Sequence, residues 1–117
     1  MKTLSEVLKE YSDHPDFIGV QITGVNQKGA VDDTVLHIAV RKGPLEDIKV
    51  LIESGSNIDE KGDLGNTPLH FAAMSGRREV VEYLLSKGAD KRLVNEFGQS
   101  AKRVAELGGK KNILDLL

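Results

Sequence analysis

Apolar residues near the start of the chain recur three or four positions apart. They are Leu4, Val7, Leu8 and Tyr11. Positions i, i+3, i+4 and i+7 lie on one face of an α-helix, so this spacing predicts an amphipathic helix over residues 3–12. Pro15 ends that helix, and a second, short helix is expected around residues 16–20. A loop is expected over residues 24–31.

From residue 32 onward the pattern of apolar and polar positions repeats every 33 residues. Residues 32–64 and residues 65–97 align without a gap. The identities include Thr34/Thr67, Leu36/Leu69, His37/His70, Ala39/Ala72, Gly43/Gly76, Glu46/Glu79, Leu51/Leu84 and Gly55/Gly88. A fixed period of this length indicates small stacked units, each of which buries its apolar face against its neighbours.

Each unit predicts two helices separated by a glycine. In the second unit Thr67 is placed to cap the first helix, and Pro68 occupies its first turn, where a missing N–H costs nothing. Gly76 ends that helix, and Gly88 sits where a left-handed residue is wanted after the second one. The expected second helices span residues 45–54 and 78–87. An irregular polar arm then leads to the next unit.

The last segment, residues 98–117, keeps this period in a modified form. Lys102 and Arg103 stand where both preceding units have Leu and His. A terminal unit has no neighbour on its outer side, so polar residues are expected at such positions. The apolar stripe of the second helices continues at Ile113, Leu114 and Leu117.

The segment 67–72 reads Thr-Pro-Leu-His-Phe-Ala. With a 33-residue period, this T-P-L-H-x-A pattern makes the chain resemble the ankyrin-repeat family. Residues 81–90 are similar to that family's second helix and exit, and the unit 32–64 matches with Val35 in place of Pro. Gly24-Val25-Asn26 falls on the family's exit segment. The resemblance implies an all-α ankyrin-repeat solenoid of stacked helix-turn-helix units with projecting arm loops.

The length of 117 residues predicts a single domain over residues 1–117. The resemblance implies that its parts are a divergent N-terminal capping repeat (1–31), two repeats (32–64 and 65–97) and a C-terminal capping repeat (98–117). Each part is expected to contribute one helix pair.

Composition narrows the classes of function. The formal net charge is −2, from 16 basic and 18 acidic residues, so neither nucleic acid nor a membrane is expected as a partner. The absence of Cys excludes disulfides, thiolate metal sites and Cys nucleophiles. No apolar run approaches the ~18 residues of a membrane span, and the N-terminus, with Glu6 and Glu10, does not predict a signal peptide. A cytoplasmic protein without cofactors is expected.

His37 and His70 are the candidates for catalysis or metal binding. They lie one period apart on equivalent helix turns, and no carboxylate or third ligand recurs in phase with them. The resemblance implies that this His is structural, its ring bonding to backbone and neighbouring turn groups. The chain is therefore predicted not to be an enzyme, the alternative being a hydrolase or metal-dependent enzyme that uses both histidines.

The resemblance implies a protein-binding scaffold with a concave face built from arm tips and first helices. Positions free of structural duty are the candidates for partner contact. On the arms they are Val31, Asp33, Asp63, Leu64, Asn66, Glu96, Phe97 and Gln99, and on the first helices Arg41, Lys42, Met74, Ser75 and Leu107. Val31, Leu64 and Phe97 share one repeat position, so they predict an apolar stripe that either faces a partner or packs between neighbouring arms.

Charged residues are divided between the two ends of the first helices. Acidic residues gather on the arms, at Asp32, Asp33, Glu60, Asp63 and Glu96. Basic pairs gather at the other end, at Arg41-Lys42, Arg77-Arg78 and Lys110-Lys111. These are either solvated faces or groups that steer and orient a partner.

The hypothesis for function is a small adaptor or inhibitor that binds one partner protein across the concave face and is monomeric when free. A bacterial immunity-type protein that neutralises a cognate toxin is an alternative. Self-association through the apolar arm stripe is another.

Overall fold

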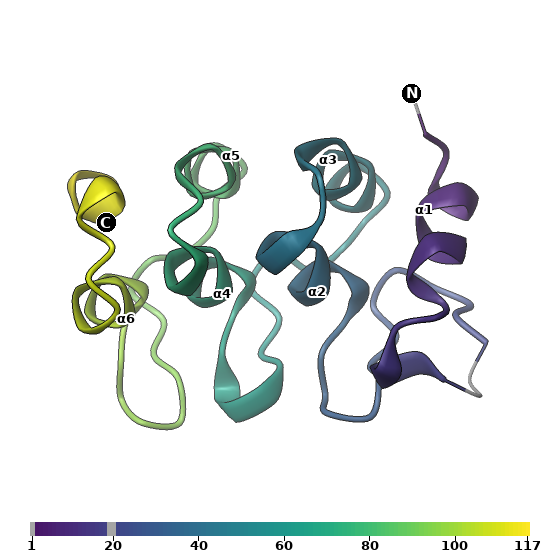
Figure 1. Cartoon of the computed structure of the whole chain (residues 1–117), viewed down its shortest axis with the longest axis horizontal. Helices are drawn as coiled ribbons and strands as arrows, with labels where there is room; N and C mark the ends of the chain where they lie inside the picture. The colour runs from purple at the N-terminus through teal and green to yellow at the C-terminus, as the bar shows by residue number, and fades with distance from the viewer. Residues whose placement is uncertain (1, 19–20) are drawn as a thin grey trace.

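Helices lie side by side along the 36 Å longest axis of the molecule (Figure 1). The computed structural model describes residues 2–18 and 21–117. Its α-helices are α1 (Leu4–Tyr11), α2 (Val35–Lys42), α3 (Leu45–Glu53), α4 (Pro68–Ser75), α5 (Arg78–Ser86) and α6 (Ala101–Leu107). Short 3-10 helices are η1 (Pro15–Phe17), η2 (Asp63–Gly65) and η3 (Lys111–Leu116). Within the described ranges there is no strand, only an isolated bridge between Val94 and Ser100.

The helices form two rows with the arms projecting from one side (Figure 1). The inner row is α2, α4 and α6, which contact one another in that order, and the outer row is α3, α5 and η3. The core lies between the rows, where aliphatic residues such as Leu36, Ile48, Leu69 and Leu84 are buried. This arrangement confirms the predicted all-α solenoid of stacked helix pairs.

The inner helices begin where the sequence predicts. Thr67 caps α4, with its Oγ1 accepting from the His70 backbone N–H at 3.3 Å, and His70 Nδ1 accepts from the Thr67 N–H at 3.1 Å. Thr34 and His37 form the same reciprocal box on α2. Each box satisfies two backbone donors that a helix start would otherwise leave unpaired.

The glycines that end the inner helices adopt different conformations. Gly76 is left-handed, with φ +63°, as a helix C-terminus favours. Gly43 is extended, because the following Pro44 disfavours a helical conformation at the preceding residue. The absence of a Cβ at Gly43 also leaves room for the Tyr11 hydroxyl.

The N-terminal unit departs from the predicted helix pair. The first predicted helix forms as α1. The second, predicted over residues 16–20, is reduced to the 3-10 turn η1. The part of that prediction that covers Gly19 and Val20 lies outside the described residues. Helix α1 packs against the outer helix α3. No spacing within residues 1–31 reveals this placement.

Asp47 on α3 holds α1 in that position. Its carboxylate is 1% exposed and accepts from the Lys2 ammonium at 2.9 Å and from the Tyr11 hydroxyl at 3.0 Å. The equivalent residues in the next two units are Val80 and Ile113, both buried and apolar. A polar residue at this core position therefore marks the contact with the N-terminal helix, because a buried carboxylate requires partners.

The last unit also departs from the pattern, since its outer element is the 3-10 helix η3. Ile113 is fully buried, while Leu114 and Leu117 are partly buried against the core. The predicted apolar stripe is thus correct although the helix type differs.

Asp32 carries backbone strain that the sequence pattern explains. Its φ is +68°, and the equivalent residues are Gly65 at +73° and Gly98 at +71°. Asp32→Gly is expected to raise the free energy of unfolding by about 0.5–1 kcal/mol, because glycine adopts this conformation without a Cβ clash. Urea denaturation measures the change.

Gly98→Ala is the matched control for Asp32→Gly. Apart from Gly98 itself and its two chain neighbours, no atom of the described residues lies within 4 Å of an added Cβ at Gly98, so the substitution tests the backbone alone. We expect a loss of about 1 kcal/mol. An Asp32→Gly protein that is less stable than wild type would contradict the strain argument.

Candidate protein-binding surface

Three arms leave the helices with the same turn geometry. Each arm is closed by one backbone hydrogen bond, from Gly29 N–H to Asp33 O at 2.8 Å in the first arm. The equivalent bonds are Gly62 N–H to Asn66 O at 2.8 Å and Asn95 N–H to Gln99 O at 2.9 Å. The arms are therefore defined turns, even where the N-terminal unit has only one full helix.

Asp33 connects the first arm to the second and does not face solvent. Its side chain is 1% exposed, its Oδ1 accepts from the Asp63 backbone N–H at 2.9 Å, and its Oδ2 lies 3.1 Å from the Arg41 guanidinium. The prediction that Asp33 is free to contact a partner is wrong, because this carboxylate is used inside the protein.

Asn66 is the equivalent residue of the second arm and is also structural. It is 4% exposed, and its Oδ1 accepts from Asn95 Nδ2 at 3.0 Å. The prediction that Asn66 is free for partner contact is therefore wrong as well. Gln99, its equivalent in the third arm, is partly buried and accepts from Asn95 Nδ2 at 3.1 Å through its Oε1. Of these in-phase polar residues, Asp33 and Asn66 link neighbouring arms, and Gln99 closes the third arm on itself.

The tips of the arms carry an exposed apolar row. Val31 is 45% exposed, Leu64 is 47% exposed and Phe97 is 66% exposed. Of the two alternatives for this stripe, the exposures favour solvent-facing side chains over packing between arms. The Glu96 backbone N–H donates to Leu64 O at 3.0 Å, so the second and third tips are in direct contact.

Leu64 adopts an unfavourable backbone conformation. Its φ is +56° and its ψ is 25°, and the next residue, Gly65, is also left-handed. A left-handed residue with a Cβ costs roughly 1–2 kcal/mol, which is why Gly and Asn dominate such turns. The chain thus places a strained leucine at the surface, and no sequence signal distinguished it from Val31 and Phe97.

A second row runs along the inner helices. Arg41, Met74 and Leu107 are equivalent residues of α2, α4 and α6, and Met74 and Leu107 are 38% and 58% exposed. The Arg41 guanidinium lies 4.6 Å from the centre of the Phe71 ring, in addition to its contact with Asp33. Arg41 is therefore partly structural. Beside this row Lys42 is exposed and Ser75 is partly exposed.

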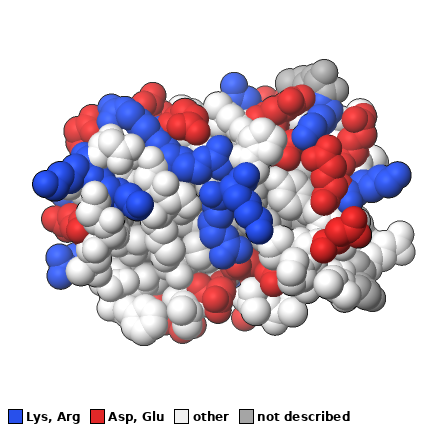
Figure 2. Space-filling model, viewed as in Figure 1, with Lys and Arg blue, Asp and Glu red and all other residues white. Residues whose placement is uncertain are grey.

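Charged side chains of both signs lie on the face drawn in Figure 2. On that face, Lys and Arg gather over the middle and the left of the stack, and Asp and Glu lie at the upper left, on the right and in small patches at the lower edge. Two of the predicted basic residues are structural. Arg77 donates to Ala39 O at 3.3 Å at the end of α2, and Arg78 makes a two-pronged ion pair with Asp115 at 2.8 and 2.9 Å.

The histidines use both ring nitrogens in structural contacts. Nε2 of His37 lies 2.7 Å from Glu60 O, and Nε2 of His70 lies 2.8 Å from Gln99 O. A carbonyl oxygen accepts only, so Nε2 carries the proton, and Nδ1 accepts from the capping threonine. Burial lowers the pKa of both imidazoles below the ordinary value. Among the described residues no cluster of three His, Cys, Asp or Glu side chains could hold a metal ion.

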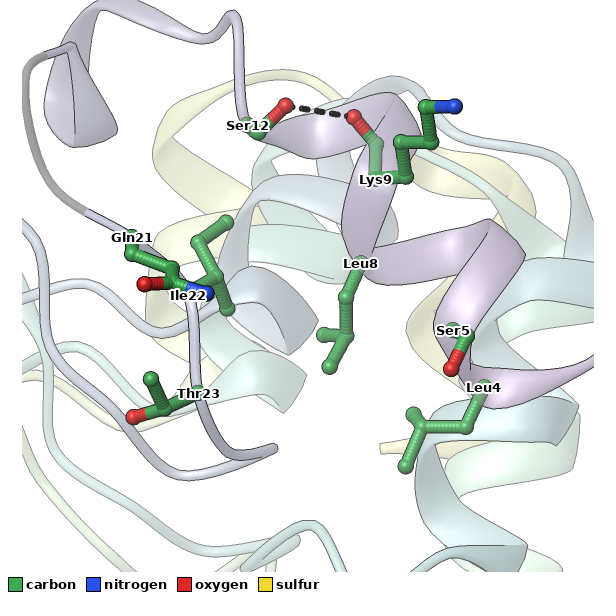
Figure 3. A pocket seen from close by; sticks show the side chains of 8 residues that line it. All are labelled: Leu4, Ser5, Leu8, Lys9, Ser12, Gln21, Ile22 and Thr23. Carbon is green, nitrogen blue, oxygen red and sulfur yellow. Dashed lines mark hydrogen bonds between the residues drawn. The ribbon is translucent and has the colours of Figure 1, made fainter.

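A groove that the sequence did not predict lies at the N-terminal end, between α1 and the segment 21–23 (Figure 3). Its volume is about 440 Å³. The lining residues are Leu4, Ser5, Leu8, Lys9, Ser12, Gln21, Ile22 and Thr23. The available signal was the apolar face of α1, which has no second full helix of its own unit to cover it.

Comparison with known protein families identifies the same repeat. The family model for ankyrin repeats matches residues 6–95 in three copies. No match was found among curated proteins. No helix in the described part of the chain is both long enough and apolar enough to cross a bilayer.

Proposed function

The chain belongs to the ankyrin-repeat family, whose repeats are generic protein–protein interaction modules, and from this we propose that it binds one partner protein across its concave face. We define that face by the arm-tip row (Val31, Leu64 and Phe97) and the inner-helix row (Arg41, Met74 and Leu107). The family is typically a non-enzymatic binding module.

The observation that carries the proposal is the repeated exposure of large apolar side chains. Phe97, Leu107, Leu64 and Met74 are between 38% and 66% exposed, and they belong to three successive units. Contiguous exposed apolar residues rimmed by charge are typical of interaction surfaces. Met74 adds an adaptable side chain that fits irregular partner surfaces.

The bonds between arms support the same proposal. The links through Asp33, Asn66 and Glu96 hold the three arms in one arrangement before any partner arrives. Binding to a preformed surface loses little conformational entropy, so more of the contact energy appears as affinity. A module of this kind acts as an adaptor when it joins two proteins. It acts as an inhibitor when the covered partner surface is an active site.

Met74→Glu/Phe97→Glu is expected to abolish partner capture. Each glutamate would place a charge in an interface where an apolar side chain is buried, which costs at least about tenfold in affinity. The measurement is a pull-down from a lysate of the source cells with the immobilised protein, followed by mass spectrometry. Circular dichroism melts establish that the variant is folded.

Ile18→Glu is the matched control for this experiment. Ile18 is 70% exposed and belongs to neither row, so its substitution should leave capture unchanged. A partner retained equally by wild type and by the double variant would exclude the concave face as the binding site.

A further inference from the structure

The three arm tips of the concave face differ in how they are bonded to one another and in the backbone conformation of their apolar residue. We propose, on the basis of the function proposed above, that the tips of the second and third arms dock a partner segment that combines basic with large apolar side chains. We call this surface the arm-tip patch and define it as Asp63, Leu64, Glu96 and Phe97.

The patch is continuous because the two arms are bonded directly to each other. The Glu96 N–H donates to Leu64 O at 3.0 Å. A Cβ added to Gly65 would lie 3.0 Å from both Glu96 N and Glu96 Cγ, so the Glu96 side chain runs along the backbone of the second arm. The Asp63 N–H is held by Asp33 Oδ1 at 2.9 Å. These contacts fix the two acidic and the two apolar residues on one rigid surface.

Each tip presents an acidic residue followed by a large apolar one. Asp63 and Glu96 are exposed, and neither forms an ion pair within the described residues. Leu64 and Phe97 follow them in the chain, at 47% and 66% exposure. Unpaired carboxylates beside exposed apolar groups complement a segment with Lys or Arg beside its apolar side chains, since opposite charges steer and orient the encounter.

The first arm arranges these groups differently. Ala30 and Val31 occupy the equivalent positions, and the exposed carboxylate of Asp32 follows the apolar residue instead of preceding it. Among the described residues, no backbone hydrogen bond joins the first tip to the second as the bond between Glu96 and Leu64 joins the second to the third. The docked segment is therefore placed over the second and third arms.

The backbone conformation of Leu64 supports the proposal independently of the charges and exposures given above. It occupies a left-handed turn position that an Asn or Gly would fill without strain, yet the side chain is half exposed and gains little from burial in the free protein. Strained residues persist where the surrounding structure holds them, and they cluster at binding sites and switch regions. A leucine kept in this conformation at the surface is explained if its side chain is buried by a partner.

The first test uses three synthetic peptides of about 14 residues with the same two apolar residues, Leu and Phe, flanked by Lys, by Glu or by Ser. Fluorescence anisotropy gives their dissociation constants at about 0.05 M and about 0.5 M salt. We expect the Lys-flanked peptide to bind at least about tenfold more tightly than the Glu-flanked one at low salt, with the difference reduced at high salt. Equal binding of the two would overturn the proposal.

Charge reversal within the patch checks the location. Asp63→Lys/Glu96→Lys is expected to exchange the preference between the Lys- and Glu-flanked peptides. The control Asp13→Lys/Glu53→Lys changes the net charge equally at exposed residues outside the patch and should keep the wild-type preference. An unchanged preference in the patch variant would reject the site, and an exchanged preference in the control as well would assign the selectivity to net charge.

Leu64→Asn separates a binding role of the leucine from a structural one, because its melting temperature and its affinity for the peptide should change in opposite directions. Asn tolerates the left-handed conformation, so the melting temperature should rise by about 4 °C. Binding of the Lys-flanked peptide should weaken by about tenfold, because an apolar contact is lost. The control Val94→Thr alters another exposed apolar arm residue and should not affect binding. Unchanged binding in Leu64→Asn removes the leucine from the site.

These results are separable from those for the general function. A Lys-flanked peptide that fails to bind at about 1 mM overturns the basic-apolar specificity. The Met74→Glu/Phe97→Glu pull-down still decides whether the concave face binds a protein.

Discussion

Acidification from about pH 7.5 to about pH 5 is expected to lower the free energy of unfolding steeply, because two buried histidines must stay neutral in the folded protein. His37 is fully buried and His70 is 1% exposed. In each ring Nδ1 accepts the N–H of the capping threonine, at 3.0 Å in His37 and 3.1 Å in His70. A proton on Nδ1 would face that N–H and break the capping box.

The direction of the effect follows from the pKa of each imidazole in the two states. Burial is the main cause that holds the folded pKa of His37 and of His70 below the ordinary value of 6.5, although the hydrogen bonds to Glu60 O and Gln99 O oppose it. The stabilisation is complete above pH 6.5. As the pH falls below that value the unfolded chain binds protons that the folded chain excludes. The loss approaches about 1.4 kcal/mol per pH unit for each histidine until the folded pKa is reached.

Urea denaturation at a series of pH values measures this dependence. His70→Gln should be less stable than wild type near neutral pH. Below pH 6.5 its free energy of unfolding should depend less steeply on pH than that of wild type, by about 1.4 kcal/mol per pH unit. The control is His14→Gln, because His14 is partly exposed and its pKa is lowered by weaker burial. A slope unchanged in His70→Gln would show that the capping histidine does not carry the acid sensitivity.

Phe17→Ala is the second substitution with a large expected effect, and it should lower the free energy of unfolding by about 3–5 kcal/mol. Phe17 is fully buried and is among the largest fully buried side chains of the described residues. It lies in η1, which is bonded to the first arm through the Ala30 N–H and Asp16 O at 2.9 Å. Truncation would leave a cavity between the N-terminal unit and the first complete unit, so that α1 and η1 should separate from the stack at lower urea concentration.

Ile18→Ala supplies the comparison for Phe17→Ala, since it is the next residue and is 70% exposed. Its cost should stay within about 0.5 kcal/mol. Urea curves followed by circular dichroism, with hydrogen exchange of α1 amides, measure both variants. A loss below about 1 kcal/mol in Phe17→Ala would show that the N-terminal unit contributes little to the core.

The interior of each repeat could be predicted from the sequence because its signals are local. Thr67, Pro68 and His70 act within one helix turn, and Gly88 ends a helix through contacts three to five residues away. The apolar period identifies the buried faces in the same way. Such features depend on spacing along the chain, and the structure places them where the spacing indicates.

The N-terminal unit could not be predicted in the same way. Helix α1 follows from its apolar stripe, but its partner is Asp47, more than 30 residues away on the outer helix α3. Nothing within residues 1–31 selects the outer row. That choice results from a buried carboxylate that needs Lys2 and Tyr11 as partners.

For the candidate surface, the sequence identified the apolar row correctly and mistook two polar residues for free ones. Leu64 and Phe97 are exposed, as their shared position suggested. Asp33 and Asn66 were indistinguishable from exposed arm residues because their partners belong to the next arm. The strain at Leu64 was also invisible, since φ depends on how the whole arm closes.

The sequence by itself therefore determined the repeated unit, its caps, its buried stripes and the family, all of which depend on residues close together in the chain. The tertiary structure alone decided which arm residues face solvent, where α1 packs and which leucine is strained. Those properties depend on hydrogen bonds and contacts between stacked units about 30 residues apart. They exist only once the units are stacked, because a polar side chain in an arm finds its partner in the neighbouring arm.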